Sequence, residues 1–221
     1  MYLEDYARFA GTGEKNAAGK TLKEFLEAYN PKKYDCPCHT VDTAIFRRQG
    51  GRGLRLLLIR RKNHPSIGFW ALPGGFVDLK ENLGDAAARE LQEETGVTGV
   101  PLKQLATFGD YDRDPRWRVI TTLFFTILKE EIPVRAGDDA ADAEWFDADC
   151  GEEQTADGQT LVRLRLSAGK DRPVLTASAL LAVSGEGPLR EEKLLPQTSD
   201  GLAADHGLLI MSAMRYIRSF E

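Results

Sequence analysis

Apolar residues follow different periods in different parts of this chain of 221 residues. The run 54–59 (LRLLLI) is apolar at almost every position, which is typical of a central strand buried on both faces. Segment 160–167 alternates between apolar and polar residues, as a strand with one buried face does. Leu83, Ala87 and Leu91 recur every fourth residue, which indicates a helix with one apolar stripe. These patterns predict an α/β fold.

Further strands and helices complete this prediction. Runs rich in apolar, β-branched and aromatic residues, bounded by turn residues, predict strands at 41–47, 53–61, 105–110, 118–128, 174–183 and 189–195. Thr21 and Glu24 form a capping box ahead of an apolar helical stripe. Asn82 can cap the helix that follows it, and Gly96 stands where a C-cap glycine belongs.

The predicted elements group into an extension and one domain. Residues 1–40 precede the core, and their helix either packs on that core or pairs with a second copy in a homodimer. Residues 41–221 form the domain and end in a helix within about 202–218. Residues 150–199 exceed a minimal core, and we expect them to form an appended β-hairpin or small sheet before that helix. This insertion could shape a ligand pocket or extend a dimer interface.

Composition narrows the classes of function. The net charge of −5 argues against a general nucleic-acid binder. The first residues lack the basic and apolar regions of a signal peptide, and no apolar run approaches the roughly 18 residues that span a bilayer. Three cysteines make no disulfide framework, so we expect a cytoplasmic protein without a membrane partner. Cys36, Cys38 and His39 could bind zinc, but without a second Cys or His pair they are better explained as ordinary loop or buried residues.

One stretch of charged residues carries most of the functional information. Gly74 and Gly75 form a turn ahead of the helix, and Glu90, Glu93 and Glu94 stand at i, i+3 and i+4 on one face of it. Three like charges on one face repel one another, so a cation between them is the expected partner. Carboxylate oxygens suit a hard divalent ion such as Mg²⁺ or Mn²⁺. The alternative is a solvated acidic helix face.

This stretch resembles the Nudix box, G-x5-E-x7-R-E-U-x-E-E-x-G-U, in which U is a bulky aliphatic residue. Every prescribed position is matched, at Gly75, Glu81, Arg89, Glu90, Leu91, Glu93, Glu94, Gly96 and Val97. The resemblance implies an α/β/α sandwich around a mixed sheet. It also implies divalent-metal-dependent hydrolysis of a nucleoside diphosphate linked to another moiety. Glu81 and Arg89 would then form a structural ion pair that braces the loop against the helix.

The resemblance implies a metal site in the box. Glu90 and Glu94 would be the main ligands, Glu93 would assist, and the main-chain carbonyl of Gly74 would be a further ligand. Such an ion can neutralise phosphate oxygens and lower the pKa of a coordinated water. The expected cofactor is therefore Mg²⁺ or Mn²⁺.

A general base must also take a proton from the attacking water. In the Nudix family this base comes from the box or from a later loop. The first choice for this base is Asp139 in the acidic loop 135–144. The second choices are Glu93 in the box and Glu144 at the end of the loop. An exposed acidic loop without a catalytic role is the alternative.

A charged loop after the box predicts how the substrate is bound. Arg113, Arg116 and Arg118 alternate with aspartates around an aromatic pair, and arginine offers planar donors for phosphate. The loop is similar to that of a Nudix branch which includes ADP-ribose pyrophosphatases and related regulators. Tyr111 stands where the ADP-ribose group usually has proline. In the alternative interpretation, ion pairs between these arginines and aspartates only stabilise the conformation of the loop.

Two other residues are predicted to bind substrate, Arg60 and Phe76. Arg60 belongs to a basic cluster at a strand end, which either steers an anionic substrate or is merely solvated. Phe76 directly follows the glycine turn. The expected ligand is a small nucleotide such as ADP-ribose. The rival hypothesis is a non-catalytic nucleotide-binding sensor. Such regulators carry a winged helix after the core, and we expect the C-terminal residues here to be too few and too rich in strands for one.

Overall fold

The computed structural model describes residues 2–50, 53–130 and 140–220. It divides into two compact units, Met1–Cys36 and Pro37–Glu221. The first unit contains the short 3-10 helix η1 (Ala7–Phe9) and the helix α1 (Leu22–Ala28). The predicted capping box is present, because the Thr21 hydroxyl accepts from the Glu24 N–H and the Glu24 carboxylate accepts from the Thr21 N–H.

The second unit is built on one mixed sheet of ten strands. Eight strands run in the order β10-β9-β8-β7-β2-β1-β6-β5, while β3 pairs with β2 and β4 pairs with β1. The pair β1–β6 is parallel and the other pairs are antiparallel. The bounds are β1 Cys38–Gln49, β2 Gly53–Arg61, β3 Trp70–Ala71, β4 Gly74–Phe76, β5 Lys103–Phe108, β6 Val119–Leu128, β7 Ala140–Gln154, β8 Thr160–Ser167, β9 Leu175–Ser184 and β10 Glu191–Asp200.

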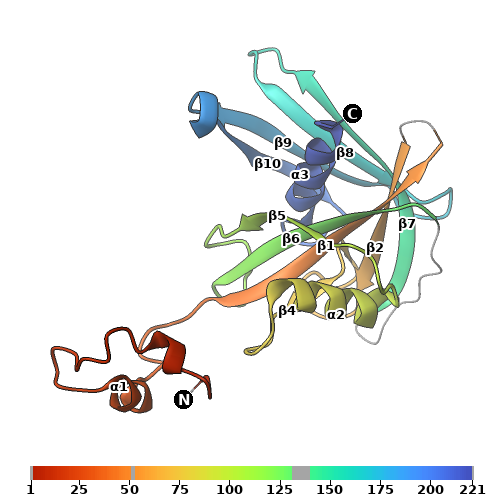
Figure 1. The fold of residues 1–221 in the computed structure, drawn as a ribbon. Coiled ribbons are helices and arrows are strands. Elements are labelled where there is room, and N and C mark those ends of the chain that lie inside the picture. The colour runs from red at the N-terminus through yellow and green to blue at the C-terminus, as the bar shows by residue number, and fades with distance from the viewer. Residues whose placement is uncertain (1, 51–52, 131–139, 221) are drawn as a thin grey trace. The chain divides into compact units, whose positions relative to one another are not determined.

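Two helices cover opposite faces of this sheet, α2 (Leu83–Thr95) and α3 (His206–Arg218), as Figure 1 shows. Alternation along the strands divides the core between them. Leu57 packs with Leu91 of α2, whereas Leu56 and Leu58 pack with α3. All three strand residues are fully buried, which confirms the predicted central strand at 54–59. The α/β/α sandwich expected for the fold is therefore the observed architecture.

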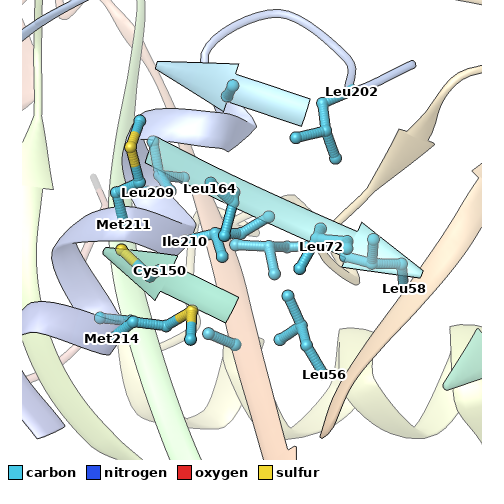
Figure 2. Close-up of a cluster of buried hydrophobic side chains, with 14 of the residues drawn as sticks. Leu56, Leu58, Leu72, Cys150, Leu164, Leu202, Leu209, Ile210, Met211 and Met214 are labelled. Carbon is cyan, nitrogen blue, oxygen red and sulfur yellow. The ribbon is translucent and has the colours of Figure 1, made fainter. Parts of the chain in front are cut away.

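The larger part of the core lies under α3 (Figure 2). Its side chains from α3 include Leu209, Ile210, Met211 and Met214, which meet Leu164 of β8. Burying a side chain of this size stabilises the fold by about 1.5–3 kcal/mol. The helix α3 thus joins the strands of the insertion to the rest of the sheet.

The insertion differs from the predicted appended hairpin. The strand β7 pairs with β2 through Ala148 and continues to Gln154, where it pairs with β8. Because one long strand serves both ladders, β8, β9 and β10 extend the core sheet and do not form a separate one. The predicted boundary near 150 lies inside β7. The third predicted strand, 189–195, corresponds to β10, which begins two residues later and ends five residues later than expected.

The C-terminal helix begins at His206, four residues later than the start of the predicted range, and ends at Arg218 as expected. Within the described part of the chain, no helix is both long and apolar enough to cross a bilayer.

Candidate active site

The glycine turn and the helix α2 bring the box residues together. Asn82 occupies the N-cap position of α2, but its side chain donates to the Asp85 carboxylate at 3.0 Å and caps no backbone N–H. Asn82 is therefore at the predicted position, but the prediction that its side chain caps the helix is wrong. Gly96 ends the helix with a φ of 75°, in the left-handed conformation that glycine adopts without strain.

The two glycines of the turn are required for space. A Cβ at Gly75 would lie 2.4 Å from the carboxyl group of Glu90, and a Cβ at Gly74 would lie 2.1 Å from the carbonyl oxygen of Val41. Side chains do not tolerate contacts this short. The absence of side chains thus lets the turn approach both α2 and β1.

Two partly buried carboxylates, Glu90 and Glu94, face this turn. The Glu94 carboxylate accepts from the Gly74 N–H at 2.7 Å. Burial raises the pKa of Glu94 to about 8, and the nearby charges of Glu90 and Asp42 add to this effect, although the bond from Gly74 opposes it. Burial also raises the pKa of Glu90. Both groups are held in surroundings that disfavour their charged forms and would gain from a cation.

Arg89 links the turn, the preceding loop and the helix. Its Nε and Nη2 atoms donate to the two oxygens of Glu81, each at 2.8 Å. Nη2 also donates to the carbonyl of Phe76 at 3.0 Å, while Nη1 donates to Glu90 at 2.7 Å and to Glu93 at 3.1 Å. The bidentate bond lowers the pKa of Glu81. This geometry is that of a brace between loop and helix.

The donor set fits a hard divalent ion. Mg²⁺ is usually held by one or two carboxylates, with water and substrate phosphate oxygens completing the shell. Glu90 and Glu94 provide two carboxylates beside the Gly74 main chain. In the described residues, no three Asp, Glu, His or Cys side chains are arranged to hold an ion without such additional ligands, either here or around Cys38. Glu93 is mostly exposed and bonds to Arg89.

These carboxylates open onto a cavity of about 480 Å³. It lies between the glycine turn, the loop 61–66, the loop 113–116 and the start of α3. Its polar and charged lining consists of Thr40, Asp42, Arg61, Lys62, Asn63, His64, Ser66, Asp78, Arg89, Glu90, Glu94, Arg113, Asp114, Arg116 and His206. The cavity thus combines acidic groups with several cationic side chains, as a site for a metal ion and an anionic ligand requires.

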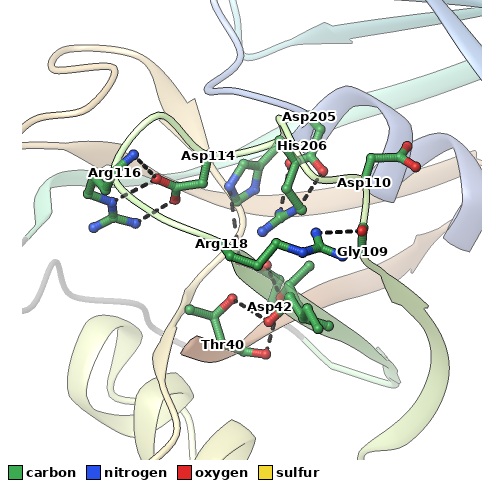
Figure 3. A network of polar contacts seen from close by, with 12 residues as sticks. Thr40, Asp42, Gly109, Asp110, Asp114, Arg116, Arg118, Asp205 and His206 are labelled. Carbon is green, nitrogen blue, oxygen red and sulfur yellow. Dashed lines mark hydrogen bonds and ion pairs between the residues drawn. The ribbon is translucent and has the colours of Figure 1, made fainter. Parts of the chain in front are cut away.

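The predicted substrate-binding residues divide into two groups. Phe76, Arg113 and Arg116 line the cavity, and the Arg116 guanidinium lies 5.3 Å from the centre of the Phe76 ring. Arg118 and Arg60 do not line it, because Arg118 donates to the carbonyl of Gly109 at 2.6 Å and Arg60 to that of Gly68 at 3.0 Å. Figure 3 shows Arg118 at Gly109 and Arg116 beside Asp114.

Arg113 and Arg116 also differ in their own ion pairs. Arg113 donates from Nε and Nη2 to both oxygens of Asp205, at 2.8 and 2.9 Å, and its side chain is almost fully buried. Arg116 makes a similar pair with Asp114 and thereby lowers the pKa of that carboxyl. Arg113 therefore ties its loop to the start of α3, whereas the Arg116 side chain is half-exposed at the cavity.

Two of the three candidate bases, Glu93 and Glu144, lie in the described part of the chain. Asp139 lies outside the described residues. Glu144 belongs to β7, lies 3.6 Å from Arg172 and does not line the cavity. Glu93 does not line it either, but lies within reach of Arg89 in the box.

Sequence reasoning did not assign several polar residues of the cavity wall to the site, among them Asp42 and His206. Asp42 is a buried carboxylate in β1 and accepts from the Thr121 hydroxyl at 2.6 Å. His206, the first residue of α3, lines the cavity too. Arg61 lies there in place of its neighbour Arg60. An acidic residue within the apolar strand 41–47 was the available signal for Asp42.

The sequence profile of the NUDIX domain matches residues 39–160, which are 122 of the 221 residues. The chain therefore belongs to the Nudix family, which confirms the family membership expected from the box.

Individual relatives add to this family assignment. The chain is 45% identical over 106 residues to the ADPR responsive transcriptional repressor NtrR of Acinetobacter baylyi, a match that covers 47% of this chain and 42% of that protein. It is 39% identical over 137 residues to the ADP-ribose pyrophosphatase of Methanocaldococcus jannaschii, covering 60% of this chain and 77% of that protein. The match thus spans less than half of the repressor.

Solved structures share the fold. A MutT/nudix family protein from Enterococcus faecalis superposes with a TM-score of 0.68 at 32% identity, covering 90% of this chain and 70% of that chain. The NUDIX domain of Shewanella oneidensis NrtR complexed with ADP ribose gives a TM-score of 0.53 at 32% identity, covering 57% and 82%. The first of these extends well beyond the matched domain, into the strands that follow residue 160.

Proposed function

We propose that this protein hydrolyses the pyrophosphate bond of ADP-ribose or a closely related nucleoside diphosphate derivative, with Mg²⁺ or Mn²⁺ as cofactor. The observation that carries the proposal is one cavity in which two partly buried carboxylates, Glu90 and Glu94, share the lining with Arg61 and Arg116. The similarity to an ADP-ribose pyrophosphatase and to a domain complexed with ADP ribose supports the choice of substrate.

In this proposal the ion would be held by Glu90, Glu94 and the carbonyl of Gly74, and Glu93 would assist. When bound, the ion supplies charge neutralisation at the phosphate oxygens and a lowered pKa for a coordinated water. Water adds to one phosphorus, and the bridging oxygen leaves with the other phosphate, which gives AMP and ribose 5-phosphate from ADP-ribose. Arg89 holds Glu90 in place through a hydrogen bond, and the Gly74 N–H holds Glu94.

Arg61 and Arg116 would bind phosphate oxygens, because a guanidinium presents several donors in one plane. Phe76 would offer its ring to the nucleotide base, since the ring is half-exposed and one face already lies near Arg116. Arg113 would hold the loop in position through Asp205.

The test is turnover of a panel of nucleotides by the full chain with Mg²⁺. We expect kcat/KM to be highest for ADP-ribose or a near relative, with AMP and the sugar phosphate as products. No turnover of any nucleoside diphosphate derivative would contradict the proposal.

The general base is tested by the variants Glu93→Gln, Asp139→Asn and Glu144→Gln. The base variant should lower kcat by about a hundredfold or more and remove the acidic limb of the pH–rate profile. The other two should retain activity. Glu93 is the candidate in the box, and Asp139 is the one in the acidic loop.

A second candidate function is nucleotide sensing without catalysis. The specific observation in its favour is the 45% identity to a repressor described as responsive to ADPR. In that case ADP-ribose would bind and be recovered intact after long incubation with Mg²⁺. Binding of duplex DNA that changes when ADP-ribose is added would further support this alternative.

A further inference from the structure

His206 is a buried histidine on the wall of the cavity, and the proposed chemistry does not use it. It is the first residue of α3, and its exposed fraction is 8%. It lines the same cavity as Glu90 and Glu94, which come from the other helix. A buried polar ring in such a place requires hydrogen bonds for both of its nitrogens.

One ring nitrogen of His206 has a fixed role. The main-chain N–H of Leu72 donates to Nδ1 at 3.0 Å. A main-chain N–H can only donate, so Nδ1 must be the acceptor and carry no proton. The neutral ring then carries its proton on Nε2. Leu72 is itself buried, which protects this bond from exchange with water.

The other ring nitrogen of His206, Nε2, carries a proton that can be donated to a ligand. The oxygen of Asp42 nearest to Nε2, Oδ1, lies 4.0 Å away, which is beyond hydrogen-bond distance. The second Asp42 oxygen accepts from Thr121 at 2.6 Å and holds the carboxylate against the sheet. Among the described residues, Nε2 therefore forms no hydrogen bond. Its proton is presented at a cavity wall that Arg61 and Arg116 also line.

We propose that His206 is a substrate-binding residue which donates its Nε2–H to a non-bridging phosphate oxygen of the nucleotide. This inference rests on the proposed function and deepens it. A lysine or arginine at this position would form an ion pair with Asp42. A neutral imidazole held by Leu72 adds a donor for phosphate without that competition. The ring also fixes the direction of the donor, because its other nitrogen is already bonded to the backbone.

The test compares two substitutions that copy different nitrogens of the ring. In His206→Asn, the amide oxygen can still accept from Leu72, but the donor toward the cavity is lost. In His206→Gln, the longer amide can return an N–H to the position of Nε2. The probe is the α,β-methylene analogue of ADP-ribose with Mg²⁺, whose P–C–P bridge is not hydrolysed.

We expect His206→Asn to raise the Kd of this analogue about ten- to a hundredfold, which is the usual loss for a hydrogen bond to a charged group. His206→Gln should recover much of the affinity. Adenosine, which has no phosphate, should bind all three proteins equally, and the thermal midpoint of His206→Asn should stay near that of the wild type. In ¹⁵N NMR spectra, Nε2 should be the protonated nitrogen and should shift when the analogue binds.

Equal affinity of the wild type and His206→Asn for the analogue would overturn the inference and leave the proposed function intact. A proton on Nδ1 in the free protein, or an equal loss of adenosine binding in the variant, would also overturn it. If the wild type neither binds the analogue nor cleaves ADP-ribose, the proposed function itself fails, and the role of His206 fails with it.

Discussion

The helices α2 and α3 have the same length, 13 residues each, and cover the two faces of one sheet, yet they contribute very differently. The helix α3 buries eight residues, most of them large and apolar, whereas α2 buries four, of which two are alanines. The inner side of α2 is shared between Leu91 and the carboxylates Glu90 and Glu94. The difference shows that α3 stabilises the fold while α2 gives up apolar contact to hold a charged site.

The largest effects that test this difference between the helices come from truncating one buried leucine in each helix to alanine. Leu91 and Leu209 are both buried, at 1% and 0% exposure. Changing either to alanine should lower the free energy of unfolding by about 2–5 kcal/mol in urea titrations. Leu91→Ala should also lower kcat about ten- to a hundredfold, because α2 positions Glu90 and Glu94.

Leu209→Ala is the matched control for that prediction. Its kcat should remain within about twofold of the wild type, since its neighbours lie in the core under α3. Equal losses of kcat in the two variants would show that the helices do not divide their roles.

Removing one charged ligand sharpens the comparison. Glu94→Gln keeps an oxygen that can accept from Gly74 but removes the charge. We expect kcat/KM for ADP-ribose with Mg²⁺ to fall at least about a hundredfold. Mutating a residue that only orients a metal ligand typically costs about ten- to a hundredfold, and removing the charge of a ligand itself should cost at least as much. Asp85→Asn provides the control for charge, because it removes one carboxylate charge from an exposed position of α2 that does not line the cavity. A fully active Glu94→Gln protein would contradict the proposed role of Glu94 as a metal ligand.

The glycine turn gives a smaller effect with a control in the same segment. Gly75→Ala places a methyl group 2.4 Å from the Glu90 carboxyl, so this carboxylate must move. The Mg²⁺ dissociation constant, measured by calorimetry, should rise roughly tenfold, in line with a disturbed ligand. Gly84→Ala in α2 meets no atom within 4 Å and should instead stabilise the protein by up to about 1 kcal/mol. Unchanged Mg²⁺ binding in Gly75→Ala would refute the close packing of turn and helix.

The smallest effect is expected at the cavity rim. Arg116→Ala should raise the KM for ADP-ribose several-fold with little change in kcat, because this side chain would bind the ground state and the transition state alike. Arg60→Ala should leave both constants unchanged, since Arg60 bonds to Gly68 away from the cavity. The same response in both variants would assign the loop 113–116 a structural role only.

Local patterns in the sequence predicted most of the fold. The strands 53–61 and 160–167 have the predicted bounds, because alternation and flanking turn residues specify a strand locally. The insertion was described less well. Its continuity with the core depends on β7 pairing with β2 and β8 at once, and pairing between distant strands leaves no local signal.

The candidate site divides in the same way. The box is contiguous, so its turn and its clustered carboxylates could be read from spacing, whereas the brace between Glu81 and Arg89 was implied by the resemblance to the Nudix box. The wall of the cavity is assembled from β1, the loop after β2 and the start of α3, so Asp42 and His206 could not be placed. The basic cluster shows the same limit for a simpler reason: Arg61 lines the cavity and Arg60 does not, because neighbouring residues of a strand point to opposite faces and the register was not known.

The most direct test of the division between helices is the free energy of unfolding of the wild type and Glu94→Gln, measured against pH with EDTA and again with Mg²⁺. The pKa of Glu94 is about 8 in the folded protein, against 4.5 as its ordinary value. Between these values the folded protein holds a proton that the unfolded chain releases. The stabilisation from this proton is therefore full below about pH 4.5 and is lost as the pH rises through about 8.

We predict that in EDTA the wild type loses roughly 2–5 kcal/mol more than Glu94→Gln between pH 5 and pH 9, and that Mg²⁺ restores stability to the wild type alone. Parallel pH curves for the two proteins, or equal stabilisation of both by Mg²⁺, would contradict the account of α2 as the helix that holds a destabilising metal site.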